Sequence, residues 1–410
     1  MSSATVPART SLVAAGGLPF LITSLVGRLP ASTLQLGLLM FVTASGLGFG
    51  LGGLTVAAAG LGTAFGAPVV GRLVDRIGAF PVVAAAIVLQ TLGLVGVLLA
   101  VQFAPNPALI VACAALIGAA NPQIGPVARG RWSTLARERN QPDLIRLAMG
   151  YEGACDEAGF VVGPAAAGLL VGILGPVPAL IVLIVFVWVG EGVFLAHLIV
   201  HRDDWRPAAS ASTTRTTARM DALVLAWPLL ACLSVGMVFG STQTALTAAH
   251  AAAGTPGLTG LVYGCVGIGS AIVSILIVRL VPVRLGTRIG VGGIVVAGAS
   301  LAMMQVGSPA ASALVAVVVG AAVGAIVVSA FAAIERIAPT ARINQAMTFG
   351  ATSLTLGVSA GALLAGNLVD VPAFGFVPAV AAGLIAVLAG TLMLVARSNP
   401  AVVSAVPGRP

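Results

Sequence analysis

The chain is a nearly continuous series of long apolar segments separated by short polar connections. A helix that crosses a membrane needs about 20 mostly apolar residues, and we find twelve segments that meet this requirement. They cover residues 21–44, 51–73, 80–102, 109–127, 148–174, 177–197, 223–247, 258–280, 289–306, 310–334, 346–369 and 373–395. A membrane β-barrel would instead show short segments of alternating hydrophobicity. The pattern therefore predicts an all-α polytopic membrane protein with twelve transmembrane helices.

The composition excludes most soluble classes of protein. Of the 410 residues, 59% are hydrophobic and 8% are charged, whereas a soluble domain carries roughly 25% charged residues. Disordered chains have low hydrophobicity and are excluded for that reason. The four cysteines and three histidines are scattered, so we expect neither a disulfide framework nor a metal site. No cofactor is expected, and nothing resembles the basic, aromatic-rich patch that would make nucleic acid a partner.

The basic residues predict the orientation of the chain. All 20 are Arg; apart from Arg28, which lies inside the first segment, they fall in the even-numbered connections, at the segment ends beside them (Arg72 and Arg279) or in the two tails. Cytoplasmic connections carry the excess of basic residues in membrane proteins, so both termini are expected in the cytoplasm. The use of Arg alone, with much Ala, Gly and Val, points to a GC-rich bacterial genome. The expected location is therefore the bacterial inner (plasma) membrane.

The chain divides into two halves that resemble each other. Residues 201–221 form a polar connection between a bundle of six helices over 1–200 and a second over 222–396, with a cytoplasmic tail over 397–410. The fifth and eleventh segments both begin with Ala-Met, and their glycines coincide at an offset of 198 residues (346 − 148). The aligned pairs are Gly159 with Gly357, Gly163 with Gly361 and Gly168 with Gly366. We therefore predict two pseudo-symmetric six-helix bundles, an arrangement in which transporters bind their substrate between the halves.

The loop after the second segment identifies a family. It reads Gly71-Arg72-Leu73-Val74-Asp75-Arg76-Ile77-Gly78 and closely resembles the G-x-L-x-D-R-x-G-R-R/K loop of the major facilitator superfamily, with Gly71, Asp75, Arg76 and Gly78 among the matches. Ala79 and Phe80 replace the final basic pair. The resemblance implies a gating loop in which Asp75 contacts the other half at a helix N-terminus, where an anion is favoured. The alternative is a solvated turn that only sets topology.

The fifth segment carries a second resemblance. Gly150, Gly159, Gly163, Pro164 and Gly168 follow the glycine spacing of the antiporter branch of this superfamily, which consists mostly of drug/proton exporters. Ordinary packing of small residues between helices is the alternative. Many such exporters also have an Arg in the middle of the fourth segment, whereas here Arg129 and Arg131 stand at its cytoplasmic end.

Four acids lie within apolar segments, namely Glu152, Asp156, Glu157 and Glu191. Charges there are costly and usually line a cavity or form pairs. At ~100° per residue, Glu152 and Asp156 fall within about 60° of Gly159 and Gly163 on one helical face. The second half has no acid at the equivalent positions, so packing symmetry does not require these acids.

Burial disfavours the charged form of a carboxylic acid, so such a group can load and release a proton near neutral pH. We therefore hypothesise that Asp156, helped by Glu152, couples transport to protons, with Arg28 as counter-ion. Alternatively, Glu152 pairs with Arg129, Arg131 or Arg146, while Glu157 and Glu191 only hold their helices to neighbouring ones.

The predicted function is a secondary active transporter that works by alternating access as a monomer in the lipid bilayer, exporting small amphipathic molecules in exchange for protons. An uptake symporter or facilitator of the same fold is the main alternative. A transport-dead sensor and a membrane-embedded enzyme are more distant alternatives, and we expect no enzymatic activity. Candidate polar residues of the substrate cavity are Gln35, Asn121, Gln123, Tyr151, Gln243 and Tyr263.

Overall fold

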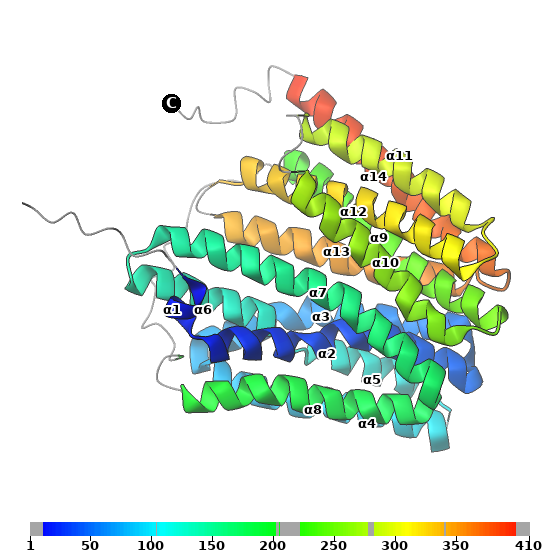
Figure 1. Cartoon of the computed structure of the whole chain (residues 1–410), viewed down its shortest axis with the longest axis horizontal. Coiled ribbons are helices and arrows are strands. Elements are labelled where there is room, and N and C mark those ends of the chain that lie inside the picture. Colours follow the sequence, from blue (N-terminus) through cyan, green and yellow to red (C-terminus); the bar gives the residue numbers. More distant parts are fainter. Residues whose placement is uncertain are drawn as a thin grey trace, which may run out of the picture.

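The computed structural model describes residues 11–103, 105–201, 205, 222–277, 283–339 and 342–398, which are helical almost throughout (Figure 1). The α-helices are α1 (Leu12–Gly16), α2 (Leu18–Val42), α3 (Gly48–Ile77), α4 (Ala79–Phe103), α5 (Pro107–Ala119), α6 (Ile124–Glu138), α7 (Pro142–Leu174), α8 (Pro176–Val200), α9 (Ala222–Ala252), α10 (Thr259–Leu276), α11 (Leu285–Met303), α12 (Pro309–Ile337), α13 (Ile343–Gly366) and α14 (Val377–Ser398). A π-helical turn η1 (Thr43–Leu47) and the 3₁₀ turns η3 (Pro256–Leu258) and η5 (Pro372–Phe376) connect some of them.

Eleven helices of the described chain are long and apolar enough to cross a membrane. The first of them, Leu18–Ile77, has 60 residues, which is about 90 Å of helix and three times the thickness of the apolar bilayer core. It consists of α2 and α3, which meet at Gly46, where φ is 81° and the helical path is interrupted. Because α2 and α3 also pack against each other, this segment crosses twice. The prediction of an all-helical fold with twelve crossings is therefore confirmed.

The fourth crossing differs from the predicted continuous helix over 109–127. It is broken between α5 and α6, where Gln123 has a left-handed backbone with φ of 53°. Pro122 has no N–H group to donate and restricts the residue before it, which ends α5. The Asn121 side chain accepts a hydrogen bond from the Gln123 N–H at 3.1 Å and so satisfies part of the break. The chain then restarts as α6 after the left-handed residue.

The helices form two bundles. Helices α2–α8 pack mainly among themselves and form the first half, and α9–α14 form the second half, which lies above the first in Figure 1. The expected linker over 201–221 lies outside the described residues apart from His201 and Trp205, and the expected tail over 397–410 lies outside them apart from its first two residues. The described Arg residues other than Arg28 lie near the end of the molecule where α3 passes into α4 and α6 into α7. We call this end the Arg-rich end.

The packing of the repeated glycines confirms the pseudo-symmetry. Gly159 and Gly163 lie against Ser32 of α2, the first crossing of their half, and Gly357 and Gly361 lie against Met237 and its neighbours on α9, the first crossing of theirs. The third pair makes equivalent contacts across the molecule, because Gly168 meets Gly260 of α10 and Gly366 meets Gly53 of α3. Glycines that are 198 residues apart in the sequence thus make equivalent contacts in the two halves.

The two halves meet mainly through α3 with α13 and α7 with α10. The close approaches lie at the start of α3 and α10 and toward the end of α7 and α13, as in the pairs Gly53 with Gly366 and Gly168 with Gly260. These parts of the four helices are all at the end opposite the Arg-rich end. Glycine is required there because a Cβ on Gly168 would lie 2.5 Å from the Gly260 nitrogen.

The buried apolar clusters also place the contact between the halves away from the Arg-rich end. One cluster combines residues of both halves, including Met40, Val56, Ala167 and Val358, whereas the other clusters of the described chain each stay within one half. Toward the Arg-rich end Phe65 of α3 is exposed. The halves are therefore in close contact at the opposite end, and no apolar cluster or glycine contact of the described residues joins them at the Arg-rich end.

Candidate functional site

Four charged side chains from α2, α6 and α7 form a cluster inside the first half. Arg28 pairs with Glu152, and its Nη1 also lies 2.9 Å from Oδ1 of Asp156. Arg129 pairs with the other carboxylate oxygen of Asp156. We call Arg28, Arg129, Glu152 and Asp156 the charge cluster; its two cations and two anions balance.

Glu152 and Arg28 form its buried part. The side chain of Glu152 is 0% exposed and that of Arg28 is 6% exposed. Glu152 accepts a hydrogen bond from the Trp132 indole N–H at 2.9 Å, and Arg28 donates from Nε to the backbone oxygen of Ser24 at 3.1 Å. A buried ion pair is tolerated when its remaining donors and acceptors are satisfied in this way.

Asp156 and Arg129 form the accessible part. Their side chains are 40% and 38% exposed, whereas the side chain of Glu152 is fully buried. Asp156 stands one helical turn before Phe160, whose ring stacks on Phe239 of α9 at 5.8 Å between centroids. The accessible acid thus lies next to the point where α7 first meets the other half.

The signature residues from Gly71 to Ile77 form the last turns of α3, and Gly78 alone joins α3 to α4. Gly78 adopts φ of 90° and ψ of 161°, a conformation essentially restricted to glycine, whereas Gly71 has open space around it. Asp75 and Arg76 are exposed and make no hydrogen bond or ion pair with any described residue. The predicted contact of Asp75 with the second half is therefore not formed in this state.

The sequence matches the family model described as Major Facilitator Superfamily over residues 20–362. The chain belongs to the major facilitator superfamily. Its fold is similar to that of a bacterial homologue of the iron transporter ferroportin in an inward-facing state, with 17% identity and a TM-score of 0.66 over 94% of this chain and 99% of that one. It is also similar to the nucleoside transporter NupG, with 14% identity and a TM-score of 0.67 over 92% and 98% of the two chains.

A third similar structure is a POT family transporter in complex with 5-aminolevulinic acid, with 12% identity and a TM-score of 0.68 over 92% of this chain and 95% of that one. No curated protein matches the sequence. Family and fold together identify a transporter of this superfamily and not an enzyme.

The other two intramembrane acids of this superfamily member lie outside the charge cluster. Glu157 makes no hydrogen bond or ion pair with the described residues. Glu191 of α8 is 0% exposed and accepts a hydrogen bond from Gln90 of α4 at 3.3 Å. The second carboxylate oxygen of Glu191 and the amide oxygen of Gln90 are both buried without a partner in the described part of the chain. The pair joins two helices of the first half.

The polar residues predicted for the transporter's substrate cavity are dispersed. Asn121 and Gln123 belong to the break between α5 and α6, and Tyr151 donates to the backbone oxygen of Leu21 at 2.6 Å. Tyr263 donates to the backbone oxygen of Phe239 at 3.4 Å. Gln243 is 3% exposed, and its amide nitrogen has no described partner, while Gln35 is half-buried. Two of these side chains are thus already engaged with backbone oxygens.

Of the predicted glycine motif in α7, Gly150 has open space around it.

From the sequence, Arg129 is only an alternative partner of Glu152, whereas the structure pairs Arg129 with Asp156 and Glu152 with Arg28. The sequence pattern does not single out Trp132, which donates to Glu152. Arg129 and Trp132 both lie on α6, which begins after the break and packs against α7. The usable signal was the Asn121-Pro122-Gln123 sequence, which interrupts an apolar segment with residues that favour a chain break.

Proposed function

We propose that this chain is a secondary active transporter that exchanges protons for small amphipathic molecules by alternating access, with Asp156 as the proton-coupling group. The proposal rests on one observation: Asp156 is a partly exposed carboxylate shared by two arginines, one of them buried, next to the contact between the halves. Charges at this depth of a membrane protein are costly and usually functional.

The proton changes which helices are held together. Ionised Asp156 bridges Arg28 of α2 and Arg129 of α6. When Asp156 takes up a proton, this attraction is lost; Arg28 keeps Glu152 as its partner, whereas Arg129 is released. The link between α6 and α7 through Asp156 therefore weakens. Glu152 acts as the fixed counter-charge, because its fully buried carboxylate is held by Arg28 and by the Trp132 indole N–H.

The orientation follows from the charges. We place the Arg-rich end in the cytoplasm of a bacterium, because basic residues accumulate on that side of membrane proteins. The halves then open toward the cytoplasm. In the alternate state, closure of this end brings Asp75 to the second half, which is the contact that the signature loop predicts.

Export of amphipathic molecules is favoured by the glycine spacing of α7 and by acids present in one half alone. The similar structures are a homologue of an iron transporter, a nucleoside transporter and a transporter in complex with 5-aminolevulinic acid. They therefore favour no single cargo. Uptake by a facilitator of the same fold is the competing function, because a balanced ion-pair cluster also suits a purely structural role.

The test is proton flux in inside-out vesicles with an imposed pH gradient, to which cationic drugs, sugars and amino acids are added in turn. Wild type is compared with Asp156→Asn and with the matched control Asp143→Asn, which removes an exposed acid from the same helix. We expect at least one compound to discharge the gradient in wild type and control but not in Asp156→Asn. Gradient-independent solute uptake by all three proteins, with no discharge, would establish the facilitator instead.

A further inference from the structure

Glu191 of α8 and Gln90 of α4 form a polar pair inside an apolar interface of the first half. Both residues are 0% exposed. One helical turn away on the same two helices, Ile87 and Leu94 of α4 and Val187 of α8 are buried in apolar clusters. The pair is therefore enclosed by hydrocarbon, and it is separate from the charge cluster of α2, α6 and α7.

The pair has one hydrogen-bond donor too few. Gln90 donates from its amide nitrogen to one carboxylate oxygen of Glu191 at 3.3 Å. The other carboxylate oxygen of Glu191 and the amide oxygen of Gln90 are buried, and neither has a partner in the described part of the chain. Each such acceptor is costly, because it has lost its hydrogen bonds to water. An ionised carboxylate only accepts hydrogen bonds, so it cannot supply the missing donor.

No cation compensates Glu191. Helix α2 packs against α8 and carries Arg28, but that guanidinium is held by the charge cluster. The charged residues in the apolar part of α7 are acids, α5 brings the thiol of Cys113 toward α4, and the charges of α3 lie at its Arg-rich end. Within the described chain, the one hydrogen-bond partner of Glu191 is Gln90. An ionised Glu191 would thus be a buried and unpaired charge, which is very costly.

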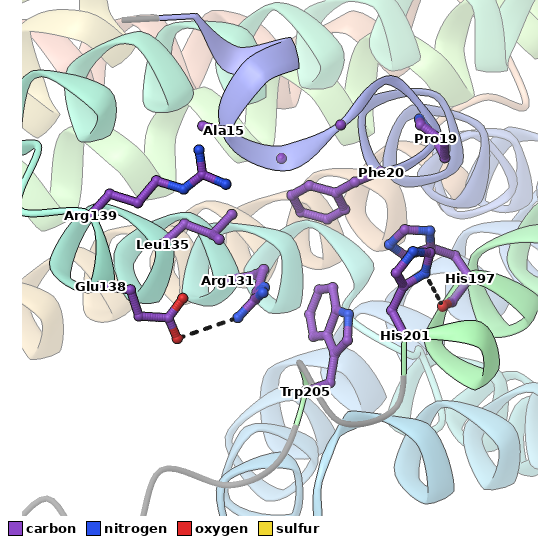
Figure 2. A pocket seen from close by; sticks show the side chains of 12 residues that line it. Ala15, Pro19, Phe20, Arg131, Leu135, Glu138, Arg139, His197, His201 and Trp205 are labelled. Atoms are coloured by element: carbon purple, nitrogen blue, oxygen red, sulfur yellow. Dashed lines mark hydrogen bonds and ion pairs between the residues drawn. The ribbon is translucent and has the colours of Figure 1, made fainter.

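The histidines of α8 lie away from the pair. His197 and His201 line a polar cavity at the Arg-rich end, where their rings stack at 4.3 Å between centroids (Figure 2). His197 follows Glu191 by six residues (197 − 191), which is about 9 Å along the helix. The described chain shows no hydrogen bond or ion pair between Glu191 and either imidazole.

We propose that Glu191 carries a proton in this state and forms a neutral acid–amide pair with Gln90. The proton is the missing donor, because the protonated oxygen of Glu191 donates to the amide oxygen of Gln90 while the amide nitrogen donates to the other carboxyl oxygen. One proton thus satisfies both unpartnered oxygens and removes the buried charge. The site is a resident proton-binding site that joins α4 to α8.

The resident proton differs from the proton that couples transport. The side chain of Asp156 is 40% exposed, whereas Glu191 is fully buried. In the transport cycle proposed above the first half moves as one bundle, so the bond between α4 and α8 persists through the cycle. Glu191 is therefore a positioning residue, and its proton does not count among those exchanged for cargo.

The test is infrared difference spectroscopy on the purified full-length protein in lipid. Wild type is compared with Glu191→Gln at about pH 7, well above the value of about 4 near which a solvated glutamic acid titrates. We expect wild type to show the carbonyl band of a protonated carboxylic acid, and Glu191→Gln to lose it. The matched control is Glu138→Gln, which removes an acid whose side chain is 54% exposed and should lose ionised carboxylate bands instead. Loss of carboxylate bands in Glu191→Gln would overturn the proposal and assign a buried water to the unpartnered oxygens.

A second variant tests the partner. Gln90→Leu keeps the acid and removes the amide, so the band of the protonated acid should remain and move to higher frequency, because its carbonyl no longer accepts a hydrogen bond. A band at the wild-type frequency would overturn the pairing.

The vesicle assay tests the resident role separately. Glu191→Gln should keep the proton flux of wild type, and loss of flux in the folded variant would overturn this role. Absence of flux in wild type would contradict the coupling at Asp156 instead, and the infrared bands would still decide whether Glu191 is protonated.

Discussion

The contact between α7 and α10 predicts that one added methyl group shifts the conformational equilibrium of the transporter. A Cβ built on Gly168 lies 2.5 Å from the nitrogen and 2.7 Å from the Cα of Gly260. Both atoms belong to the backbone of α10, so no side chain can turn away to make room. In Gly168→Ala the two helices must separate.

The magnitude follows from the cost of overpacking, which is about 1–3 kcal/mol for an added methyl group in a packed interface. The higher helix propensity of Ala acts in both states and cancels. Alternating access separates this contact when the opposite end opens, so the penalty falls on the described state alone. At 1.4 kcal/mol per tenfold change, the ratio of the two states shifts by about 5- to 140-fold toward the one open at the opposite end.

The assay uses a reporter cysteine at Val56, in a background in which the four native cysteines are alanine. Val56 is 0% exposed and lies in the apolar cluster between the halves, so a membrane-impermeant maleimide reaches it when the opposite end opens. We expect the labelling rate to rise with the open population. Gly150→Ala is the control, because a Cβ there meets no atom within 4 Å. Equal labelling rates in the folded Gly168→Ala and Gly150→Ala proteins would refute the reasoning.

Substitutions at Arg28, Glu191 and Gly78 test the first half and its turn. Arg28→Met leaves Glu152 buried without its cation and should lower the free energy of unfolding by about 3–5 kcal/mol. Adding Glu152→Gln should restore part of this loss. A denaturant titration measures both effects, and a double variant no more stable than Arg28→Met would contradict the pairing. Glu191→Gln should keep the stability of the protein, because its amide can donate to the unpartnered oxygen of Gln90. Glu191→Leu should lower the stability by about 1–3 kcal/mol. Equal melting temperatures for the two variants would contradict the hydrogen bond between these helices. Gly78→Ala should cost about 1–3 kcal/mol through backbone strain, and an unchanged melting temperature would show that the turn adapts.

The crossings could be predicted from sequence because the bilayer leaves few alternatives. Backbone groups in the apolar core must bond within their own helix, so a long apolar segment becomes a spanning helix whatever its neighbours are. The break before α6 escaped the same reasoning, because a hydropathy window averages over Asn121, Pro122 and Gln123. The residues after this break matter for the site, since Arg129 of α6 pairs with Asp156.

The sequence predicts which charged residues belong to the site better than it predicts which side chains pair with each other. A lone Arg28 in the first crossing and two acids on one face of the fifth require compensation inside the membrane, so their association could be expected. The partner of Glu191 could not, because Gln90 lies 101 residues away on another helix and hydropathy gives no rotation for either. Such pairings depend on how whole helices are turned, which is decided by packing against several neighbours at once.

Comparison of the two halves distinguishes the residues that the fold requires from those that the proposed proton coupling requires. The glycine contacts occur in both halves, at equivalent positions and against equivalent helices, so they serve the motion that the halves share. The acids do not repeat, since Gly350 and Leu354 stand at the positions equivalent to Glu152 and Asp156. Under the proposed coupling, a proton at Asp156 acts on one bundle alone and loosens α6 from α7 there, whereas the second bundle has no acid at the matching positions. Changes at the glycine contacts should alter the balance of states at every pH, whereas changes at Asp156 should alter only its dependence on protons.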